Sequence, residues 1–299
     1  MAQTISSSYV RWPQRLYRAI NLIAGDEVLN NDKNGGGAVP DDLAANIFRL
    51  ARRIESEHVN RGRPVNYADL HKSEAFGEFQ ILVQLLKGFD LDTLATSHDS
   101  KAFWINLYNA LIIHAVIVLQ PKAKVSSIRG FFEKAAYNVG GLRYSANDIE
   151  HGVLRKNAGH PLIPGPQFGK RDPRCANIVA TLDPRVHFAL NCAAKSCPPL
   201  NFYSPELLDR QLDLATRNFV SSGGLVIHRS MNTIYLSPLF SWYASDFGAS
   251  LFGYRHKEKL ITYVIQYIEN EEDQEFLRHS NQEQKLKVRF QEYDWSLNE

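Results

Sequence analysis

The 299-residue sequence is poor in cysteine, has modest numbers of glycine and proline, and shows almost no excess of charge of either sign. Eighteen glycines and 13 prolines exclude collagen-like and low-complexity chains, and an apolar content of 44% excludes intrinsic disorder. The formal net charge is +2, from 34 basic and 32 acidic residues, so nothing predicts a nucleic-acid partner, which usually requires a clustered basic face. A chain of this length can bury a core without metal or disulfide cross-links.

The three cysteines, Cys175, Cys192 and Cys197, are too few, and odd in number, for a disulfide framework. They suit a reducing compartment, where a free cysteine is usually a small buried apolar residue. No apolar segment with a small-residue cleavage site is visible near residue 1, and the longest apolar run, residues 110–119, is shorter than the roughly 20 residues that cross a bilayer. We therefore expect a cytoplasmic protein with no membrane partner.

Apolar spacing predicts a helix-rich chain with short strands. Residues 1–62 are expected to form an N-terminal helical extension with a Gly-rich linker, followed by a domain over residues 63–299. Helices are predicted over residues 13–24, 41–58, 73–89, 99–119, 148–156, 204–219, 240–247 and 257–269. Strands are predicted over residues 185–192, 225–228, 233–236 and 287–293, with a strand pair over residues 137–144 that turns at Gly140 and Gly141. The fold class is α+β, a helix-rich single domain around a small antiparallel or mixed sheet.

No standard catalytic or nucleotide-binding motif is present, but the helix over residues 99–119 carries unexpected polar residues. Asn106 and Asn109 stand within an otherwise apolar segment, and asparagine is a poor residue for a helix interior because its amide competes with the backbone. A buried amide costs free energy unless it is hydrogen-bonded. We therefore predict that both asparagines bind neighbouring backbone segments beside the strand that contains His187.

The segment DPRVHFALNCAAKSCPPL holds the second group of candidate residues. If residues 185–192 form a strand, its alternation places Cys192 on a core face, as a buried packing thiol, and His187 on the opposite face. Cys197 follows in a loop long enough to fold back over the His187 face, which is the minimum for a thiolate–imidazolium pair. Asn191 lies too far along the strand to orient the imidazole. The candidate orienting residues are Asp246, Glu150, Asn106 and Asn109.

Two alternatives remain open for this segment. The first is a structural Cys-Pro-Pro loop beside a hydrogen-bonded core histidine. The second is a zinc site, because Cys175, His187, Cys192 and Cys197 are all potential ligands. The strand alternation separates His187 from Cys192, and there is no C-x-x-C motif, so we expect no metal and no other cofactor.

Five segments together resemble a known family. They are WINLYNAL (residues 104–111), DIEHGVLR (148–155), DPRVHFALNCAAKSCPPL (183–200), YLSPLFSWYASDFG (235–248) and YDWSLN (293–298). In this order they resemble the uncharacterised family named "domain of unknown function 547", over about residues 66–298. The resemblance implies a shared fold and site but no established reaction. The family pattern has Cys-Gly where this chain has Cys192-Ala193, which disfavours a left-handed backbone turn there.

The resembling segments are richer in polar and aromatic residues than packing requires. As candidate binding residues we select Trp104, Asn106, Glu150, Arg155, Asn191 and Tyr243. Glu150 and Arg155 lie on the short helix over residues 148–156, where a solvated charged face is the usual interpretation and an arginine clamp for a carboxylate is the alternative.

The leading functional hypothesis is an enzyme, or the inactive descendant of one, with a thiol–imidazole site. Cys197 is the nucleophile, His187 the base, and Asp246 or Asn109 the orienting residue. The reaction is acyl transfer or amide hydrolysis on a peptide-like or amide substrate. The alternative is a non-catalytic protein-interaction module, which fusions of plant members of the resembled family to coiled coils favour.

Overall fold

The computed structural model describes residues 11–23, 27–31, 37–59, 70–250, 252 and 255–298. The chain divides into two compact units. Unit 1 comprises Met1–Leu182, Leu190–Glu206 and Trp295–Glu299, and unit 2 comprises Asp183–Ala189 and Leu207–Asp294. The predicted boundary at residue 62 lies inside unit 1. The existence of a separate extension stays a prediction.

The core of unit 1 is built on helix α5 (Ser97–Leu119), which begins with a capping box of Thr96 and Asp99. The Thr96 hydroxyl accepts the Asp99 N–H, and the Asp99 carboxylate accepts the Thr96 N–H, so two unpaired donors of the first turn are satisfied. Residues 102–112 and 114–117 of this helix are buried, which agrees with its apolar residues being spread around most of its circumference. It is long and apolar enough to cross a bilayer, unlike the shorter run noted in the sequence, but 83% of its most apolar window is buried within the protein.

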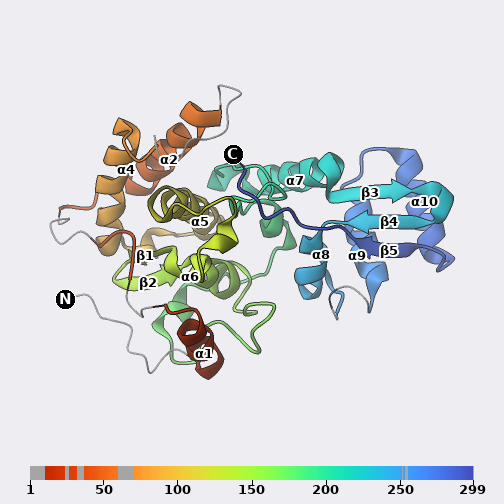
Figure 1. Cartoon of the computed structure of the whole chain (residues 1–299), viewed down its shortest axis with the longest axis horizontal. Helices are drawn as coiled ribbons and strands as arrows, with labels where there is room; N and C mark the ends of the chain where they lie inside the picture. Colours follow the sequence, from red (N-terminus) through yellow and green to blue (C-terminus); the bar gives the residue numbers. More distant parts are fainter. Residues whose placement is uncertain are drawn as a thin grey trace. The chain divides into compact units, whose positions relative to one another are not determined.

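Helices α2 (Leu43–Val59) and α4 (Glu74–Leu85) pack beside each other, and α2 also packs against α5 (Figure 1). Ser73 caps α4, with its hydroxyl accepting the Phe76 N–H. The apolar positions predicted from spacing, including Leu43, Ile47 and Ile54, are fully buried. A segment predicted to belong to an extension therefore supplies part of the core of unit 1.

Strands β1 (Ala136–Val139) and β2 (Leu142–Ser145) form the predicted antiparallel pair. Gly140 and Gly141 connect them with φ angles of 57° and 82°, the left-handed conformation that a two-residue hairpin of this type needs at both positions. Asn30, inside the predicted linker, is fully buried and bonds to this hairpin, since its amide donates to the Asn138 carbonyl and accepts the Asn138 N–H. Residues 1–10, 24–26, 32–36 and 60–62 of the predicted extension lie outside the described residues.

The hairpin continues into a helical segment, Asp148–Leu154, wound with wide π-type turns. Asp148 binds the guanidinium of Arg174 at 2.9 Å, and Arg174 also forms a paired contact with Asp172. Burial alone would raise the pKa of Asp148, but Arg174 and the nearby Arg18 and Arg143 hold it below its usual range. Helix α1 (Trp12–Ile20) joins this network through Arg18, which binds Glu133 of the four-residue helix α6 (Phe131–Lys134).

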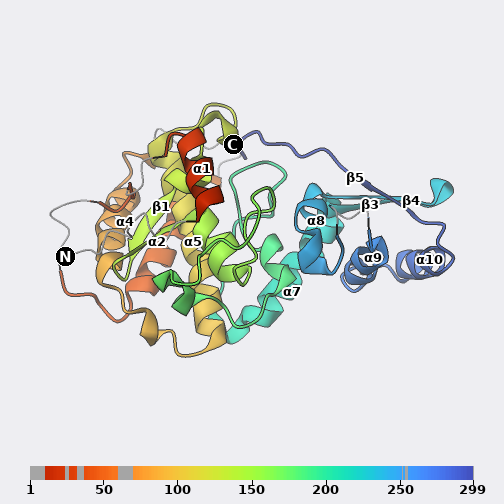
Figure 2. The ribbon, with the colours of Figure 1, turned by 90° about the horizontal axis from the view of Figure 1, so that it is seen from below.

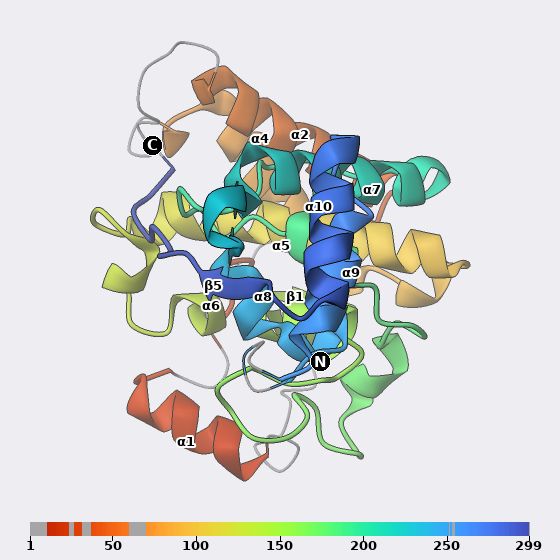
Figure 3. The ribbon, with the colours of Figure 1, turned by 90° about the vertical axis from the view of Figure 1, so that its right-hand side faces the viewer.

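Unit 2 contains a three-stranded mixed sheet. Strand β4 (Thr233–Leu236) lies in the middle, antiparallel to β3 (Leu225–His228) and parallel to β5 (Lys287–Phe290). Figure 2 shows this sheet edge-on, with α9 (Lys257–Ile265) and α10 (Glu271–Gln282) beside each other on one of its faces, and in Figure 3 α10 lies in front of α9.

Helices α7 (Leu208–Phe219) and α8 (Pro238–Trp242) complete unit 2. Its core is an apolar cluster that includes four phenylalanine rings in contact. Phe188 packs against Phe219 and Phe240, and Phe240 packs against Phe247. The α+β class is thus confirmed, with one antiparallel and one mixed sheet in place of a single small one.

The secondary structure differs from the prediction at two places. The strand predicted over residues 185–192 is a short 3-10 helix, Pro184–Phe188, followed by an irregular segment. Asp183 caps this helix by accepting the Arg185 N–H, and the fixed φ of Pro184 suits a first helical position. Helix α10 was not predicted, because its sequence, EEDQEFLRHSNQ, is almost wholly polar and only Leu277 and Ser280 are buried.

Candidate functional site

The two asparagines of α5 hold the segment that contains both candidate cysteines. The Asn106 amide donates to the Tyr203 carbonyl and accepts the Tyr203 N–H, both at 2.7 Å. Asn109 donates to the Asn201 carbonyl at 2.9 Å and accepts the Asn191 N–H at 3.0 Å. The predicted backbone pairing of both amides is confirmed. Their partners belong to residues 191–203, not to a strand that contains His187.

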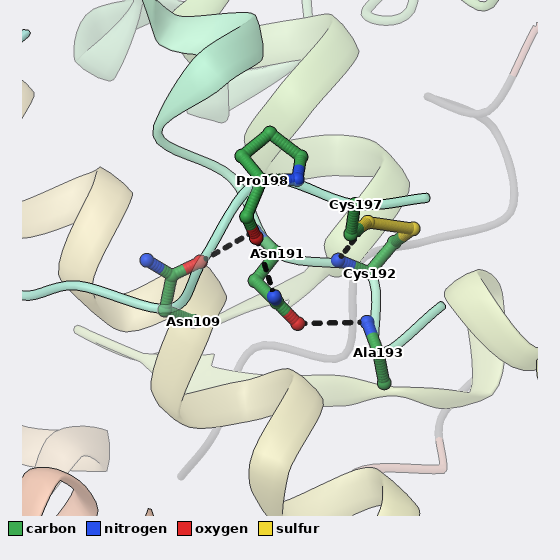
Figure 4. The surroundings of a disulfide bond; sticks show 6 residues. All are labelled: Asn109, Asn191, Cys192, Ala193, Cys197 and Pro198. Atoms are coloured by element: carbon green, nitrogen blue, oxygen red, sulfur yellow. Dashed lines mark hydrogen bonds between the residues drawn. A yellow bond between two sulfur atoms is a disulfide. The ribbon is translucent and has the colours of Figure 1, made fainter. Parts of the chain in front are cut away.

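Asn191 then braces the inside of this loop, as Figure 4 shows. Its side chain donates to the Pro198 carbonyl at 2.7 Å and accepts the Ala193 N–H at 2.8 Å. Ala193 has a φ of 64°, so the left-handed turn that the Cys-Gly pattern of the resembled family implies is kept by an alanine. This conformation costs a residue with a Cβ about 1–2 kcal/mol. The bonds from Asn191 compensate for that cost.

Cys192 and Cys197 form a disulfide bond across the loop, with their Cα atoms 6.2 Å apart. The Cys192 N–H also donates to the Cys197 sulfur at 2.9 Å (Figure 4). The prediction that Cys192 is a buried, inert packing thiol is wrong, since its side chain is half-buried and bonded to Cys197. The error follows from the absent strand: without its alternation, nothing directs Cys192 into a core.

Cys197 borders a cavity of about 320 Å³ within unit 1. Asn191 and Lys195 of the same loop also line it, together with apolar side chains of α2 and α5. The third cysteine, Cys175, lies elsewhere and donates its thiol hydrogen to the Gly169 carbonyl. Burial and the nearby Asp172 carboxylate raise the pKa of the Cys175 thiol, so it remains protonated at neutral pH.

His187 forms a separate arrangement within unit 2. Its Nε2 lies 2.9 Å from Oδ2 of Asp246, and the two side chains are only 1% and 2% exposed. Tyr243 stacks on the imidazole, with ring centroids 3.9 Å apart and an interplanar angle of 15°, and the Ser245 hydroxyl donates to the other Asp246 oxygen. The structure thus brings His187 together with Asp246, one of the four candidate orienting residues. The predicted pairing of His187 with Cys197, which belongs to unit 1, stays a prediction.

The remaining candidate binding residues are buried in unit 1. Trp104 is fully buried and packs against Tyr144, with ring centroids 4.7 Å apart. Arg155 is 2% exposed and donates to the Gly159 carbonyl at 2.6 Å, with the same nitrogen 3.3 Å from Nδ1 of His151. Glu150 is 8% exposed. A solvated charged face on residues 148–156, the usual interpretation of such a helix, is therefore wrong.

No group of three or more histidine, cysteine or acidic side chains that could hold a metal ion occurs among the residues that the structure describes. Two of the four ligands considered for zinc, Cys192 and Cys197, have their sulfur atoms joined in the disulfide. The sequence pattern did not predict Cys192 as the partner of Cys197. Their separation of five residues in a loop that ends in two prolines was the available signal, since such a spacing allows the two sulfur atoms to meet.

These features define a helix-rich α+β protein with a braced, half-buried disulfide beside a cavity. Residues 92–220 match the family model described as "Protein of unknown function, DUF547", so the resemblance to this family is confirmed over that segment. The first three of the five resembling segments lie within the match, whereas residues 235–248 and 293–298 lie beyond it. No curated protein and no solved structure matches the chain.

Proposed function

We propose that the chain is a thiol-dependent oxidoreductase that performs thiol–disulfide exchange, with Cys197 as the attacking thiol and Cys192 as the resolving thiol. One observation carries the proposal: the Cys197 sulfur is bonded to Cys192, accepts the Cys192 N–H and borders a cavity. A thiolate is the nucleophile in this chemistry, and an N–H donor at the sulfur favours the thiolate over the thiol.

The loop is held by bonds that do not depend on the disulfide. Asn109 and Asn191 fix it through three hydrogen bonds to backbone groups of Asn191, Ala193 and Pro198. The two sulfur atoms are therefore expected to stay close after reduction, as repeated exchange requires. A disulfide that closes so short a loop contributes only about 2 kcal/mol through chain entropy, which gives it little value as a purely structural cross-link.

The exchange proceeds in two steps. In the reduced protein the Cys197 thiolate attacks one sulfur of a substrate disulfide, forming a Cys197–substrate disulfide and releasing the other half as a thiolate. The Cys192 thiolate then attacks the Cys197 sulfur, forms the intramolecular disulfide and releases the second half. Two electrons pass from the two cysteines to the substrate, and a cellular thiol or dithiol returns them. In a cytoplasmic protein, as we predict this one to be, a disulfide is more often catalytic than structural.

Thiol counting and trapping test this function. The oxidised protein should expose one thiol to an alkylating agent after denaturation, and the reduced protein three. Cys192→Ser should accumulate a stable mixed disulfide at Cys197 when mixed with an aromatic disulfide, whereas Cys197→Ser should not. Cys175→Ser is the matched control and should behave as the wild type. If Cys197 reacts no faster than Cys175 in the reduced native protein, the proposal is wrong.

A second candidate function is the thiol–imidazole acyl transfer or amide hydrolysis predicted from the sequence. The pair of His187 and Asp246 favours it, because a carboxylate on Nε2 fixes the orientation of the ring. If His187 serves Cys197, replacing it by glutamine should move the pH profile of Cys197 alkylation in the reduced protein, and the wild type should hydrolyse activated esters. An unchanged profile favours exchange chemistry alone. Slow alkylation in every variant favours the non-catalytic interaction module.

A further inference from the structure

The cavity beside Cys197 has a mostly apolar wall. Helix α5 contributes Ile112, Ile113 and Val116, helix α2 contributes Ile54, and the loop itself contributes Pro199 and Leu200. Its volume of about 320 Å³ is at the lower end of the range for pockets that bind small molecules. The cavity therefore has room for a compact apolar group.

The side chains of Asn191, Glu55 and Lys195, which line the cavity, provide little for an anionic ligand to bind. Both ends of the Asn191 amide are occupied by the backbone of its own loop. Glu55 lines the wall, and burial raises its pKa against the opposing effect of Arg52, as expected where apolar surroundings disfavour a carboxylate. Lys195 is exposed at the surface, where its ammonium group remains hydrated. An anion entering this cavity would lose hydration without gaining a buried partner from these groups.

Resting on the function proposed above, we infer that the disulfide substrate of Cys197 carries an uncharged aliphatic group that fills this cavity. The aliphatic group occupies the space between α2, α5 and the loop, and its sulfur meets the Cys197 sulfur at the cavity wall. The bonds that form and break are those of the exchange described above, with the aliphatic thiol released when Cys192 closes the intramolecular disulfide. A large anionic disulfide such as that of glutathione is excluded as the preferred substrate.

The test measures how fast the reduced full-length protein is oxidised by three disulfides: dibutyl disulfide, bis(2-hydroxyethyl) disulfide and glutathione disulfide. Each rate is divided by the rate at which the same disulfide oxidises a small thiol in solution. This ratio removes the differences in intrinsic reactivity among the three disulfides. We expect the normalised rate with dibutyl disulfide to exceed the other two by at least about tenfold, because the butyl chain buries more apolar surface. Dibutyl sulfide, which cannot exchange, should slow alkylation of Cys197 but not that of Cys175.

Two variants of the same helix localise the effect. Ile113→Gln places an amide in the cavity wall and should abolish the preference for the butyl compound. Val118→Gln, at an exposed position of α5 outside the cavity, should keep it. Equal normalised rates for the three disulfides, with no protection by dibutyl sulfide, would overturn this inference and leave the proposed exchange activity standing. No oxidation by any of the three would overturn both.

Discussion

The cysteine loop of unit 1 and the His187–Asp246 pair of unit 2 are stabilised by different kinds of interaction. Neutral amides of α5 and of the loop itself hold the segment that contains the cysteines. His187 instead contacts one carboxylate and lies against the rings of Tyr243 and Phe247. These amides bind backbone groups and not the sulfur atoms, so they can hold the loop whether or not the disulfide is formed. A buried hydrogen bond to a carboxylate fixes the orientation of a ring and is costly to break. The first region suits exchange chemistry and the second suits fixing a proton position.

The largest expected effect is in unit 2. Asp246→Ala removes the carboxylate that is hydrogen-bonded to the buried His187 imidazole, and we expect a loss of about 3 kcal/mol in the free energy of unfolding. Denaturant titration of the purified protein, followed by tryptophan fluorescence, measures it. Asp273→Ala removes a carboxylate from an exposed pair with Arg229 and should change stability little. Similar small losses in both variants would contradict the contrast drawn between the two regions.

The asparagines of α5 should give the next largest effect. Asn106→Leu and Asn109→Leu each leave a backbone donor and a backbone acceptor unpaired, so each should lower stability by about 1–3 kcal/mol. Asn109→Leu should in addition slow closure of the disulfide after reduction, because it releases the loop at Asn191. Asn218→Leu, at an exposed position of α7, is the control. Unchanged closure kinetics in Asn109→Leu would show that the loop is organised without α5.

Acid should weaken unit 1 through His114. Burial, with a smaller effect from His71, lowers the pKa of His114 to about 3, and its Nδ1 lies 2.8 Å from the Tyr137 hydroxyl. Because the unfolded chain binds a proton near pH 6.5 and the folded chain does not, stability is present at neutral pH and is lost as the pH falls below about 6.5. From pH 7 to pH 5 the loss should be about 2 kcal/mol.

Denaturant midpoints measured at several pH values check this prediction, with His114→Gln as the comparison. Removing the titrating group should flatten the profile between pH 7 and pH 5 by the same amount. His279→Gln changes an exposed histidine of α10 and should leave the profile as it is in the wild type. A profile that is equally steep in His114→Gln would assign the acid sensitivity to other groups, such as His160, whose pKa burial and Arg155 lower to about 4.

The smallest expected effect is a gain in stability in the cysteine loop. Ala193→Gly removes the strain of the left-handed turn but adds conformational freedom to the unfolded chain, for a net gain of roughly 0.5 kcal/mol. Ala194→Gly is the matched control because its φ is not positive, and it should destabilise. The thermal midpoints of the oxidised proteins give the comparison. A destabilised Ala193→Gly protein would mean that the buried methyl group of Ala193 matters more than the strain.

The sequence predicted the elements whose signals are local. The hairpin at residues 137–144 follows from two glycines between β-forming residues, and the strands at residues 225–228 and 233–236 follow from alternation. The predicted amide pairing of Asn106 and Asn109 follows from the cost of burying a free amide in an apolar helix. These inferences needed no knowledge of which residues are neighbours in space.

The errors occurred where capping and packing overrode the pattern. Residues 185–192 alternate as a strand does, yet Asp183 and Pro184 begin a 3-10 helix, and every inference from strand alternation was lost with the strand. Helix α10 has too few apolar residues to be recognised, because it packs against the rest of unit 2 through little more than Leu277. Burial of Arg155 and Glu150 likewise depends on segments far away in the sequence, which no local pattern reports.

The sequence by itself determined the α+β class, the resemblance to a family over residues 92–220 and the residues able to perform thiol chemistry, because these depend on composition, local periodicity and motif order. Only the tertiary structure decided which of those residues meet. In it Cys197 is bonded to Cys192, Asp246 contacts His187, and Asn106 and Asn109 of α5 bind the loop. A side chain reaches its partner through the path of the whole backbone, and that path is set by the burial of the core, to which residues throughout each unit contribute.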